Sequence, residues 1–473
     1  MNNLPFAKIT PRVAAELASI VGERNLIYAD SERLQAYSHD EAAHCPPALP
    51  EAVLKPGSAA EIAAIMRLAN REHIAVTPRG AGSGLSGGAV PIHGGIVLDC
   101  ARMSKILEID RENLTVTVEP GVITSEINDA LRPFNLFYAG YPMSLETCMI
   151  GGNVAENAGG GKAVKYGVTG RYVLGLEIVT PTGEIVELGG KLVKDVSGLN
   201  LLQLMVGSEG ILAVFTKIIL KLLPLPKANV DLLCLFDSVE KAIAVVPRII
   251  TVGGIIPTAI EFIDKLAFST ACEYLNESLP CGSSEAMLLI TVDGADQEQV
   301  EKQYDVIGEQ CLAAGASAVY VADNKANSER IWRIRRSIAE AFKVFSPNQS
   351  LEDIVVPIAA IPAMSKAISD ISQKYGVLIP CYGHAGDGNL HATPVMPPEW
   401  GLPQWERVLP AILHDLYQAC KALGGRISGE HGIGHKRKQY LAETVDPGFL
   451  NMMRSIKTAL DPNGILNPGK IFD

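Results

Sequence analysis

The chain has 473 residues, of which 48% are hydrophobic and 20% charged, so we expect a globular protein of two or three domains. The net charge of -11, without any basic stripe, argues against a nucleic-acid partner. The nine cysteines include no CxxC pair, which excludes an obvious iron–sulfur site, zinc ribbon or disulfide framework. The N-terminus has no apolar run, and charges and glycines interrupt the most apolar region, 199–225. We therefore expect a cytoplasmic protein that reaches a membrane only peripherally or through a partner.

A glycine-rich loop follows the first predicted strand. Residues 1–50 are expected to mix helix and loop, the capping box Ser58-x-x-Glu61 begins a helix, and a short strand covers Ile74–Thr77. The loop 78–88, PRGAGSGLSGG, contains G-x-G-x-x-G. A Rossmann fingerprint requires a helix directly after these glycines, whereas this sequence continues as loop and then strand. We therefore exclude a Rossmann fold and expect backbone N–H groups to wrap a pyrophosphate. A flexible loop is the alternative.

Two more glycine-rich segments follow, at 147–161 (TCMIGGNVAENAGGG) and 206–211 (VGSEGI). The other elements predicted in this half are a hairpin at 106–119, a helix at 124–134, a hairpin at 176–188 and a strand at 212–221. Asn side chains and bare amides suit a ligand that is rich in hydrogen-bond acceptors. Three separated glycine loops in one domain therefore indicate one long cofactor.

Beyond the prolines at 224 and 226, strands and helices alternate. We expect strands at 230–235, 258–262, 287–292 and 316–321, with helices at 239–250 and 297–314. Two successive β-α-β units predict a ferredoxin-like α+β sheet. The remaining expected elements are a helix at 328–345, a strand at 353–356, a helix at 363–374, a strand at 377–381 and a helix at 405–423. The turn-rich tail 461–470 is expected to dock on the protein.

Five of the nine histidines lie between positions 384 and 435. GHAGDGNLH (383–391) supplies His384 and His391, and SGEHGIG (428–434) supplies the adjacent Glu430 and His431. Two imidazoles and a carboxylate are a common ligand set for a catalytic divalent metal with an open position. Neighbours on a strand point to opposite faces, so Glu430 and His431 can share a site only if the chain turns, which the flanking glycines permit. The alternative is a glycine-rich turn with surface histidines.

Together these motifs resemble the flavin-dependent D-2-hydroxy acid dehydrogenases of the vanillyl-alcohol oxidase superfamily. That group includes D-lactate dehydrogenase, the flavin subunit of glycolate oxidase and D-2-hydroxyglutarate dehydrogenase. The resemblance covers nearly the whole chain. It depends on PRGAGSGLSGGAVP, IGGNVAENAGG, VGSEGIL, GHAGDGNLH and SGEHGIG, which occur in the family's order.

The resemblance implies an α+β protein with a two-lobed vanillyl-alcohol-oxidase-type FAD domain, a ferredoxin-like substrate (cap) domain and a C-terminal helical segment. The expected boundaries are 1–50, 51–226, 227–423 and 424–473. The family pattern assigns FAD contacts to three loops and one further position. These residues are Pro78, Arg79, Gly80, Ala81, Gly82, Ser83, Gly84, Leu85, Gly87, Gly88, Pro142, Gly151, Gly152, Asn153, Asn157, Gly159, Glu209, Gly210 and Ile211.

The same resemblance assigns the active site. His384, His391 and Glu430 would hold a divalent metal, for which Zn, Fe and Mn all remain open, and His431 would be the base. Arg335, in WRIRRS, would bind the substrate carboxylate, while Arg333 and Arg336 are expected on a solvated helix face. Asn389 would hydrogen-bond substrate or water, with a turn-forming role as the alternative. Asp387 could orient an imidazole.

The implied reaction is oxidation of a small D-2-hydroxy carboxylate such as D-lactate or glycolate. The metal would accept the hydroxyl oxygen, His431 would take the proton, and the α-hydrogen would leave as hydride to flavin N5, with a carbanion route as the alternative. Expected partners are an electron acceptor (an iron–sulfur subunit, an electron-transfer flavoprotein, a cytochrome or a quinone) and a second copy of the chain. The competing functions are a flavin-binding electron-relay subunit, a flavin-dependent lyase or transferase, and an oxidase. The first two would be expected to lack the histidine motifs.

Overall fold

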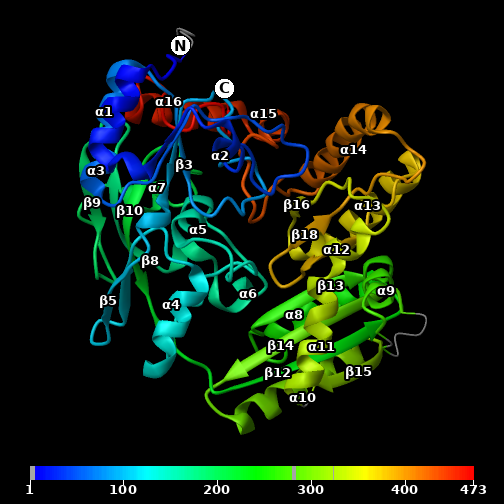
Figure 1. The fold of residues 1–473 in the computed structure, drawn as a ribbon. Coiled ribbons are helices and arrows are strands. Elements are labelled where there is room, and N and C mark those ends of the chain that lie inside the picture. Colours follow the sequence, from blue (N-terminus) through cyan, green and yellow to red (C-terminus); the bar gives the residue numbers. More distant parts are fainter. Residues whose placement is uncertain (1–5, 278, 280–283, 323, 473) are drawn as a thin grey trace. The chain divides into compact units, whose positions relative to one another are not determined.

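The computed structural model describes residues 6–277, 279, 284–322 and 324–472. The chain forms two compact units. Unit 1 consists of Met1–Gly159, Val168–Leu225 and Glu430–Asp473, and unit 2 consists of Gly160–Gly167 and Pro226–Gly429. Figure 1 labels the helices and strands of both units. Short 3-10 helices occur at Glu23–Asn25, Cys100–Arg102, Arg132–Phe134, Thr169–Arg171 and Ile358–Ala360.

The first sheet of unit 1 has four strands in the order β1-β2-β4-β3. β2, β4 and β3 are parallel, and β1 is antiparallel to β2. Helices α1 and α3 bury their apolar faces in the core that these strands line. The Ser58 hydroxyl accepts the Glu61 N–H at 3.2 Å, which confirms the predicted start of α3. The bounds are α1 (Pro11–Val21), β1 (Leu26–Tyr28), α2 (Ser31–Gln35), β2 (Ala52–Leu54), α3 (Ala59–Glu72), β3 (Val76–Arg79) and β4 (Ile96–Asp99).

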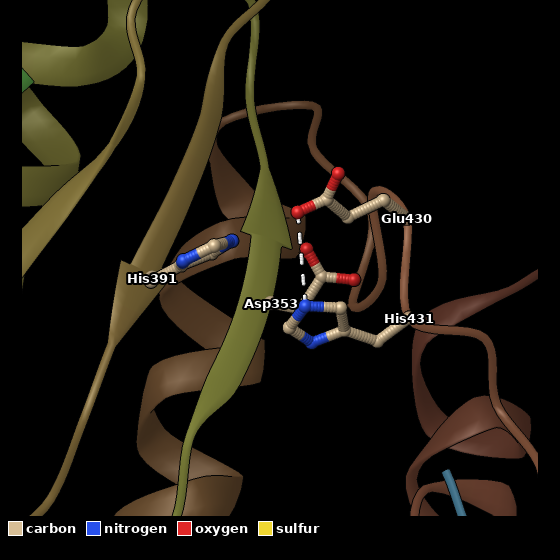
Figure 2. Close-up of side chains that lie close together, drawn as sticks. All are labelled: Asp353, His391, Glu430 and His431. Carbon is tan, nitrogen blue, oxygen red and sulfur yellow. Dashed lines mark ion pairs between the residues drawn. The ribbon is translucent and has the colours of Figure 1, made fainter. Parts of the chain in front are cut away.

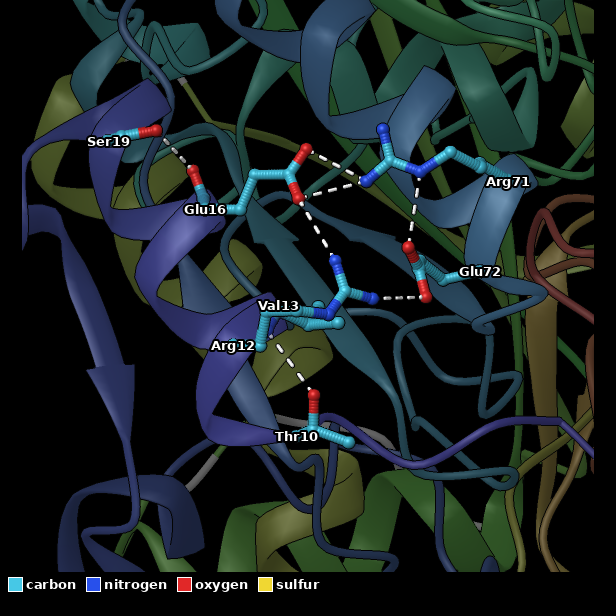
Figure 3. A network of polar contacts seen from close by, with 7 residues as sticks. All are labelled: Thr10, Arg12, Val13, Glu16, Ser19, Arg71 and Glu72. Atoms are coloured by element: carbon cyan, nitrogen blue, oxygen red, sulfur yellow. Dashed lines mark hydrogen bonds and ion pairs between the residues drawn. The ribbon is translucent and has the colours of Figure 1, made fainter.

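A polar network links α1 to α3 at the surface (Figure 3). Arg12 pairs with Glu72 at 2.8 Å, and Arg71 pairs with Glu16 at 2.8 Å. The Arg12 and Arg71 side chains are more than half exposed, so water and salt screen these ion pairs. Burial of Leu17 and its apolar neighbours on α1 therefore does more to hold the two helices together than the ion pairs do.

The second sheet of unit 1 is antiparallel, in the order β5-β6-β10-β8-β9. β5 with β6 and β8 with β9 form the two predicted hairpins, which confirms them. The two sheets correspond to the two expected lobes. The bounds are β5 (Ile106–Asp110), β6 (Thr115–Val118), α4 (Thr124–Leu131), β7 (Leu136–Phe137), α5 (Ile150–Glu156), β8 (Val173–Val179), β9 (Ile185–Gly189), α7 (Leu201–Met205), β10 (Val214–Lys221) and β11 (Leu223–Pro224), with β7 paired to β11.

The C-terminal segment of unit 1 contains α15 (Lys438–Thr444) and α16 (Pro447–Leu460). After α16 the tail runs beside β3: the Val76 N–H donates to the Ile465 carbonyl at 2.8 Å, and the Asn467 N–H donates to the Val76 carbonyl at 2.7 Å. The buried Lys470 ammonium donates to the Val90 carbonyl at 2.6 Å. These bonds confirm that the tail is docked.

Unit 2 is built on a seven-stranded sheet in the order β15-β12-β14-β13-β17-β18-β16. All neighbouring strands are antiparallel. The first four strands, with α8 between β12 and β13 and α10 between β14 and β15, have the ferredoxin-like order and confirm that prediction. The strands are β12 (Ala228–Phe236), β13 (Ala259–Asp264), β14 (Ala286–Gly294), β15 (Ala316–Ala322), β16 (Glu352–Val355), β17 (Cys381–His384) and β18 (Asn389–Ala392).

The helices of unit 2 are α6 (Ala163–Tyr166), α8 (Val239–Thr251), α9 (Lys265–Tyr274), α10 (Gln297–Ala313), α11 (Lys325–Arg336), α12 (Ile338–Lys343), α13 (Ile361–Tyr375) and α14 (Leu402–Ala422). Helices α9, α11 and α12 share one hydrophobic core with strand residues of the sheet. No helix within the described part of the chain is long and apolar enough to cross a membrane.

Three details of unit 2 differ from the sequence-based expectation. The helix predicted at 328–345 is two helices that meet at Ser337, whose ψ of −1° interrupts the helical backbone. The strand predicted at 377–381 begins only at Cys381, because Pro380 has no N–H to donate to a neighbouring strand. Helix α9 was not predicted, although Asp264 caps it by accepting the Ala267 N–H at 2.7 Å.

Candidate active site

One face of the unit 2 sheet carries both histidines of the GHAGDGNLH motif. β17 and β18 form an antiparallel hairpin that pairs His384 with Asn389 and Tyr382 with His391. Paired residues, and residues two apart on a strand, project from the same face. The two imidazole rings accordingly lie edge to face, with their centroids 5.5 Å apart. The hairpin thus brings together the two predicted imidazole ligands.

Two carboxylates continue this face on the neighbouring strands. Glu261 on β13 pairs with His384, and Asp353 on β16 pairs with His391. Both acidic side chains are fully buried. The sequence analysis missed both of them. The signal that could have found them is an acidic residue inside a strand that is otherwise apolar, because a buried carboxylate requires partners.

Glu261 divides its two oxygens between two residues of the predicted site. Oε1 lies 2.5 Å from Nδ1 of His384, and Oε2 accepts from Nε of Arg335 at 2.8 Å and lies 2.7 Å from its Nη2. Burial alone would raise the pKa of Glu261, but the charges of His384 and Arg335 and their hydrogen bonds outweigh it and lower the pKa. Glu261 is thus a carboxylate in direct contact with His384. Asp387, which was expected to orient an imidazole, accepts the Asn389 N–H in the hairpin turn at 3.2 Å.

The three arginines at the end of α11 differ in solvent exposure. Arg335 is 4% exposed, and its guanidinium carbon lies 5.0 Å from the centroid of the Tyr382 ring. Arg333 and Arg336 are exposed, as expected for a solvated helix face. Burial and the contacts with Glu261 and Tyr382 make Arg335 a fixed cation rather than a mobile one.

Asp353 ties the two histidine-bearing motifs to β16. Its Oδ2 accepts from the Ser428 hydroxyl at 2.7 Å and from the Gly429 N–H at 2.9 Å, while its Oδ1 accepts from Nδ2 of Asn389 at 2.7 Å. Asn389 Nδ2 also donates to the Ile354 carbonyl at 3.1 Å. The Asn389 amide nitrogen is thus engaged, while Oδ1 is buried and has no hydrogen-bond partner among the described residues. Asn389 can therefore offer an acceptor to a ligand.

Glu430 and His431 lie at the start of the C-terminal segment of unit 1. The chain bends at 429–431, and Nε2 of His431 lies 3.7 Å from Oε1 of Glu430. Figure 2 shows this ion pair, together with Asp353 on β16 and His391 on β18 of unit 2. After the bend, Glu209 accepts the backbone N–H groups of Ile433 and Gly434 at 2.9 and 2.6 Å. A buried carboxylate therefore fixes the backbone that follows His431.

A second carboxylate, Glu156, lies beside this segment. A Cβ on Gly432 would be 2.1 Å from Oε2 of Glu156, and that oxygen is buried without a partner among the described residues. Burial, and then the neighbouring Glu209, raise the pKa of Glu156 well above its usual value. Burial also raises the pKa of Glu209, but two backbone N–H groups oppose that shift. Of the two carboxyl groups, Glu156 therefore holds the proton more firmly.

Replacing Glu156 with Gln is expected to stabilise the protein increasingly as pH rises. A raised pKa means that the folded protein binds the carboxyl proton of Glu156 more tightly than the unfolded chain does. The contribution of Glu156 to the free energy of unfolding therefore falls as pH rises above the unfolded value of about 4.3. Thermal unfolding midpoints measured from pH 5 to 9 should diverge in favour of Glu156→Gln. A pH-independent difference would contradict this. Glu209→Gln is the matched control and should be less stable than wild type, because its NH₂ group cannot accept one of the two backbone hydrogen bonds that Glu209 receives.

The cofactor-binding residues expected from the sequence all belong to unit 1. No helix lies between β3 and β4, which confirms the exclusion of a Rossmann fold. The first glycine loop approaches the start of α5, since a Cβ on Gly80 would be 3.8 Å from the Gly152 backbone nitrogen. A Cβ on Gly152 would meet no atom within 4 Å, whereas one on Gly151 would be 2.6 Å from Pro120. The backbone at Gly152 is therefore open beside the first glycine loop. Exposed backbone N–H groups of this kind suit a ligand with acceptor oxygens.

Several polar side chains around these loops are engaged within the protein. Arg79 donates to the His39 carbonyl at 2.7 Å, Asn153 donates to the Thr124 hydroxyl at 2.7 Å, and Asn157 accepts the Gly170 N–H at 2.8 Å. The Ser208 hydroxyl, next to the Glu209–Ile211 turn, is buried and has no partner among the described residues. The sequence analysis did not single it out. These loops therefore offer a ligand mainly backbone N–H groups and one buried hydroxyl.

The family follows from models that match two parts of the chain. A model described as FAD binding domain matches residues 50–189, and a model described as FAD linked oxidases, C-terminal domain, matches residues 225–471. The chain belongs to the FAD-linked oxidase family. The family predicted from the motifs is thus confirmed, and the chain is an FAD-linked oxidoreductase.

Similar proteins match over nearly their full length. The glycolate oxidase subunit GlcD of Bacillus subtilis (strain 168) is 40% identical over 464 residues, which cover 98% of this chain and 97% of that protein. D-lactate dehydrogenase of Anaerostipes hadrus is 37% identical over 477 residues, covering 100% and 99%. D-2-hydroxyglutarate dehydrogenase of Xanthomonas citri pv. viticola is 34% identical, covering 90% and 89%.

Solved structures confirm the predicted fold class. The 4-ethylphenol oxidase from Gulosibacter chungangensis matches with a TM-score of 0.78 at 20% identity, covering 97% of this chain and 96% of that one. A p-cresol methylhydroxylase matches with a TM-score of 0.77 at 17% identity, covering 98% and 96%. At these identities the likeness concerns the fold alone.

Proposed function

We propose that this protein oxidises a small D-2-hydroxy acid of the D-lactate or glycolate type to the 2-keto acid. The observation that carries the proposal is the polar face of the unit 2 sheet, where His384 and His391 lie together near a buried arginine. The names of two relatives, a glycolate oxidase subunit and a D-lactate dehydrogenase, agree with this substrate class. In the proposed division, 51–226 binds FAD, 227–423 binds substrate, and 424–473 completes the active site.

The proposed metal ligands are His384, His391 and Glu430. The Nδ1 atom of His384 faces Glu261, so Nε2 is the nitrogen that would bind a metal. Glu430 directly follows Gly429, whose N–H is bonded to Asp353 opposite His391. Successive Cα atoms are about 3.8 Å apart, so covalent geometry alone keeps Glu430 within reach of that anchored backbone. Two imidazoles and a carboxylate suit Zn, Fe or Mn.

The reaction removes two electrons and two hydrogens from the substrate. When bound, the metal would make the substrate hydroxyl more acidic, and FAD would accept the α-hydrogen with its electron pair. His431 would take the hydroxyl proton at Nε2 or Nδ1, since an imidazole with a pKa of about 6.5 is largely neutral at pH 7. The C–H and O–H bonds break, the C=O bond forms, and the two electrons pass later to a separate acceptor.

Arg335 and Asn389 would hold the substrate in place. Nε of Arg335 donates to Glu261, while Nη2 lies 2.7 Å from the same oxygen and has no hydrogen bond within the described residues, so the substrate carboxylate would bind at the Nη end of the guanidinium. The buried Oδ1 of Asn389 would accept a hydrogen bond from the substrate or from an ordered water. The electron acceptor would be an iron–sulfur subunit, an electron-transfer flavoprotein, a cytochrome or a quinone. We propose a cytoplasmic location, reaching a membrane only through such a partner, and a second copy of the chain as a further partner.

Anaerobic bleaching of the flavin tests the proposal. The purified yellow protein would be mixed with D-lactate, L-lactate, glycolate or D-2-hydroxyglutarate, each before and after chelation. Rapid bleaching by glycolate or a D-acid that is lost on chelation and restored by metal is the expected result. Bleaching that survives chelation would remove the metal from the mechanism. Absence of bleaching by all four acids would overturn the proposed substrate class.

A further inference from the structure

The carboxylate of Glu261 lies between His384, a proposed metal ligand, and Arg335, the proposed binder of the substrate carboxylate. Glu261 is fully buried at the centre of β13. One oxygen lies 2.5 Å from Nδ1 of His384, and the other binds the guanidinium of Arg335 at 2.8 and 2.7 Å. His384 comes from β17 and Arg335 from α11, so this one side chain joins three separate elements of unit 2.

The contact with His384 selects which ring nitrogen can bind a metal. An ionised carboxylate only accepts hydrogen bonds, so the nitrogen that faces it must carry the hydrogen. Because Glu261 faces Nδ1, the neutral imidazole has its lone pair on Nε2. A carboxylate in this position fixes both the tautomer and the ring orientation of a metal-ligating histidine and raises its basicity.

The contact with Arg335 fixes the direction of the guanidinium. Two of its nitrogens face one oxygen of Glu261, and the Tyr382 ring lies 5.0 Å from the guanidinium carbon. A planar guanidinium that is held by a carboxylate and an aromatic ring has one orientation. Its remaining donors therefore point in one direction, where a second carboxylate could bind.

We propose, on the basis of the proposed function, that Glu261 is a positioning residue. It orients His384 for the metal and Arg335 for the substrate carboxylate. Both of its oxygens are engaged by protein side chains, so Glu261 is not itself a metal ligand. Its charge also balances Arg335 in the buried interior, where an unpaired arginine would be costly. Metal affinity and substrate KM should therefore both depend on a residue that contacts neither the metal nor the substrate.

Glu261→Gln tests this in the full-length flavin-containing protein. The amide keeps the shape of the side chain, but with its oxygen on Arg335 its NH₂ group can only donate to Nδ1 of His384, so the imidazole hydrogen would have to move to Nε2, the nitrogen proposed to bind the metal. Metal affinity, measured by competition between the protein and a chelator without substrate, should fall about 10- to 100-fold. KM for the best hydroxy acid should also rise, while FAD content stays unchanged. Unaltered metal affinity in a folded variant would overturn the proposal.

Asp231→Asn provides a matched control. Asp231 is a buried carboxylate on β12 of the same sheet, and it binds Thr291 and Ser328, the latter on α11. The substitution should lower the thermal midpoint without changing metal affinity or KM. Arg335→Ala is expected to raise KM and leave the metal affinity largely intact. An equal loss of metal affinity in Asp231→Asn would reduce the role of Glu261 to general stability and contradict the proposal.

A measurement on the unaltered protein avoids any dependence on the folding of the variant. Nitrogen-15 NMR of labelled histidines distinguishes a protonated Nδ1 from a protonated Nε2, and the signal of His384 can be assigned by its loss in His384→Gln. The metal-free protein should show hydrogen on Nδ1 of His384, and hydrogen on Nε2 without hydrogen on Nδ1 would contradict the proposal. If the wild-type protein binds no metal in the competition assay, the proposed metal site fails, and the tautomer still tests the role of Glu261.

Discussion

Replacing His431 with Asn is expected to slow flavin reduction by substrate at least about 100-fold while FAD and metal stay bound, because a positioned base contributes about 10²- to 10⁴-fold to such a step. Asn can still donate and accept hydrogen bonds at this position but cannot take a proton at neutral pH. The Ile433 and Gly434 N–H groups remain bonded to Glu209, so the loop backbone should keep its course. Anaerobic stopped-flow absorbance measures the reduction rate directly.

The pH dependence provides a second readout for His431. In the wild-type protein the reduction rate should rise with pH through the pKa of the base, which is about 6.5 for an ordinary imidazole. In His431→Asn this limb should disappear. His414→Asn is the matched control, since His414 is exposed on α14 and has no proposed part in the reaction. An unchanged rate in His431→Asn would assign the proton to a different group.

Much of the fold could be predicted from the sequence because its signals are local. Ser58 caps α3 through a bond to Glu61, three residues away. The hairpins of unit 1 and the ferredoxin-like order of β12 to β15 follow from apolar periodicity and turn residues. The helix break at Ser337 was missed because apolar periodicity continues across 338–342 and no Gly or Pro marks the break.

The histidine motif shows where prediction from sequence stops. The composition of GHAGDGNLH indicated two imidazoles in one site, and the hairpin of β17 and β18 places His384 and His391 on one face. Their carboxylate neighbours come from positions 261 and 353, which are far away in sequence. Their roles depend on strand register across four strands, and no spacing within a single motif encodes that register. The sequence therefore points to Asp387, which is three residues from His384, and gives no sign of Glu261, which lies beside His384 in space.

Replacing Asp353 with Asn is expected to destabilise unit 2 and weaken metal binding together. The fully buried carboxylate accepts hydrogen bonds from Ser428, Gly429 and Asn389. An amide supplies one acceptor and one donor, so its NH₂ group would face at least one of these three donors instead of accepting a hydrogen bond from it. A charge-assisted buried bond contributes about 1.5–3 kcal/mol, so we expect the free energy of unfolding to fall by about 3 kcal/mol.

The effect on metal affinity follows from the course of the chain. Gly429 is held to Asp353, and Glu430 is the next residue, so loss of this anchor increases the mobility of the proposed third ligand. A ligand that must be ordered when the metal binds costs conformational entropy, and metal affinity should fall.

Ser428→Ala is the matched control. It removes one hydroxyl bond to Asp353 but keeps the Gly429 and Asn389 bonds, so its loss of stability should be near 1 kcal/mol and its metal affinity nearly normal. Chelator competition and thermal unfolding measure both quantities. Equal metal affinity in Asp353→Asn and wild type would show that the glycines of SGEHGIG hold Glu430 without help from β16.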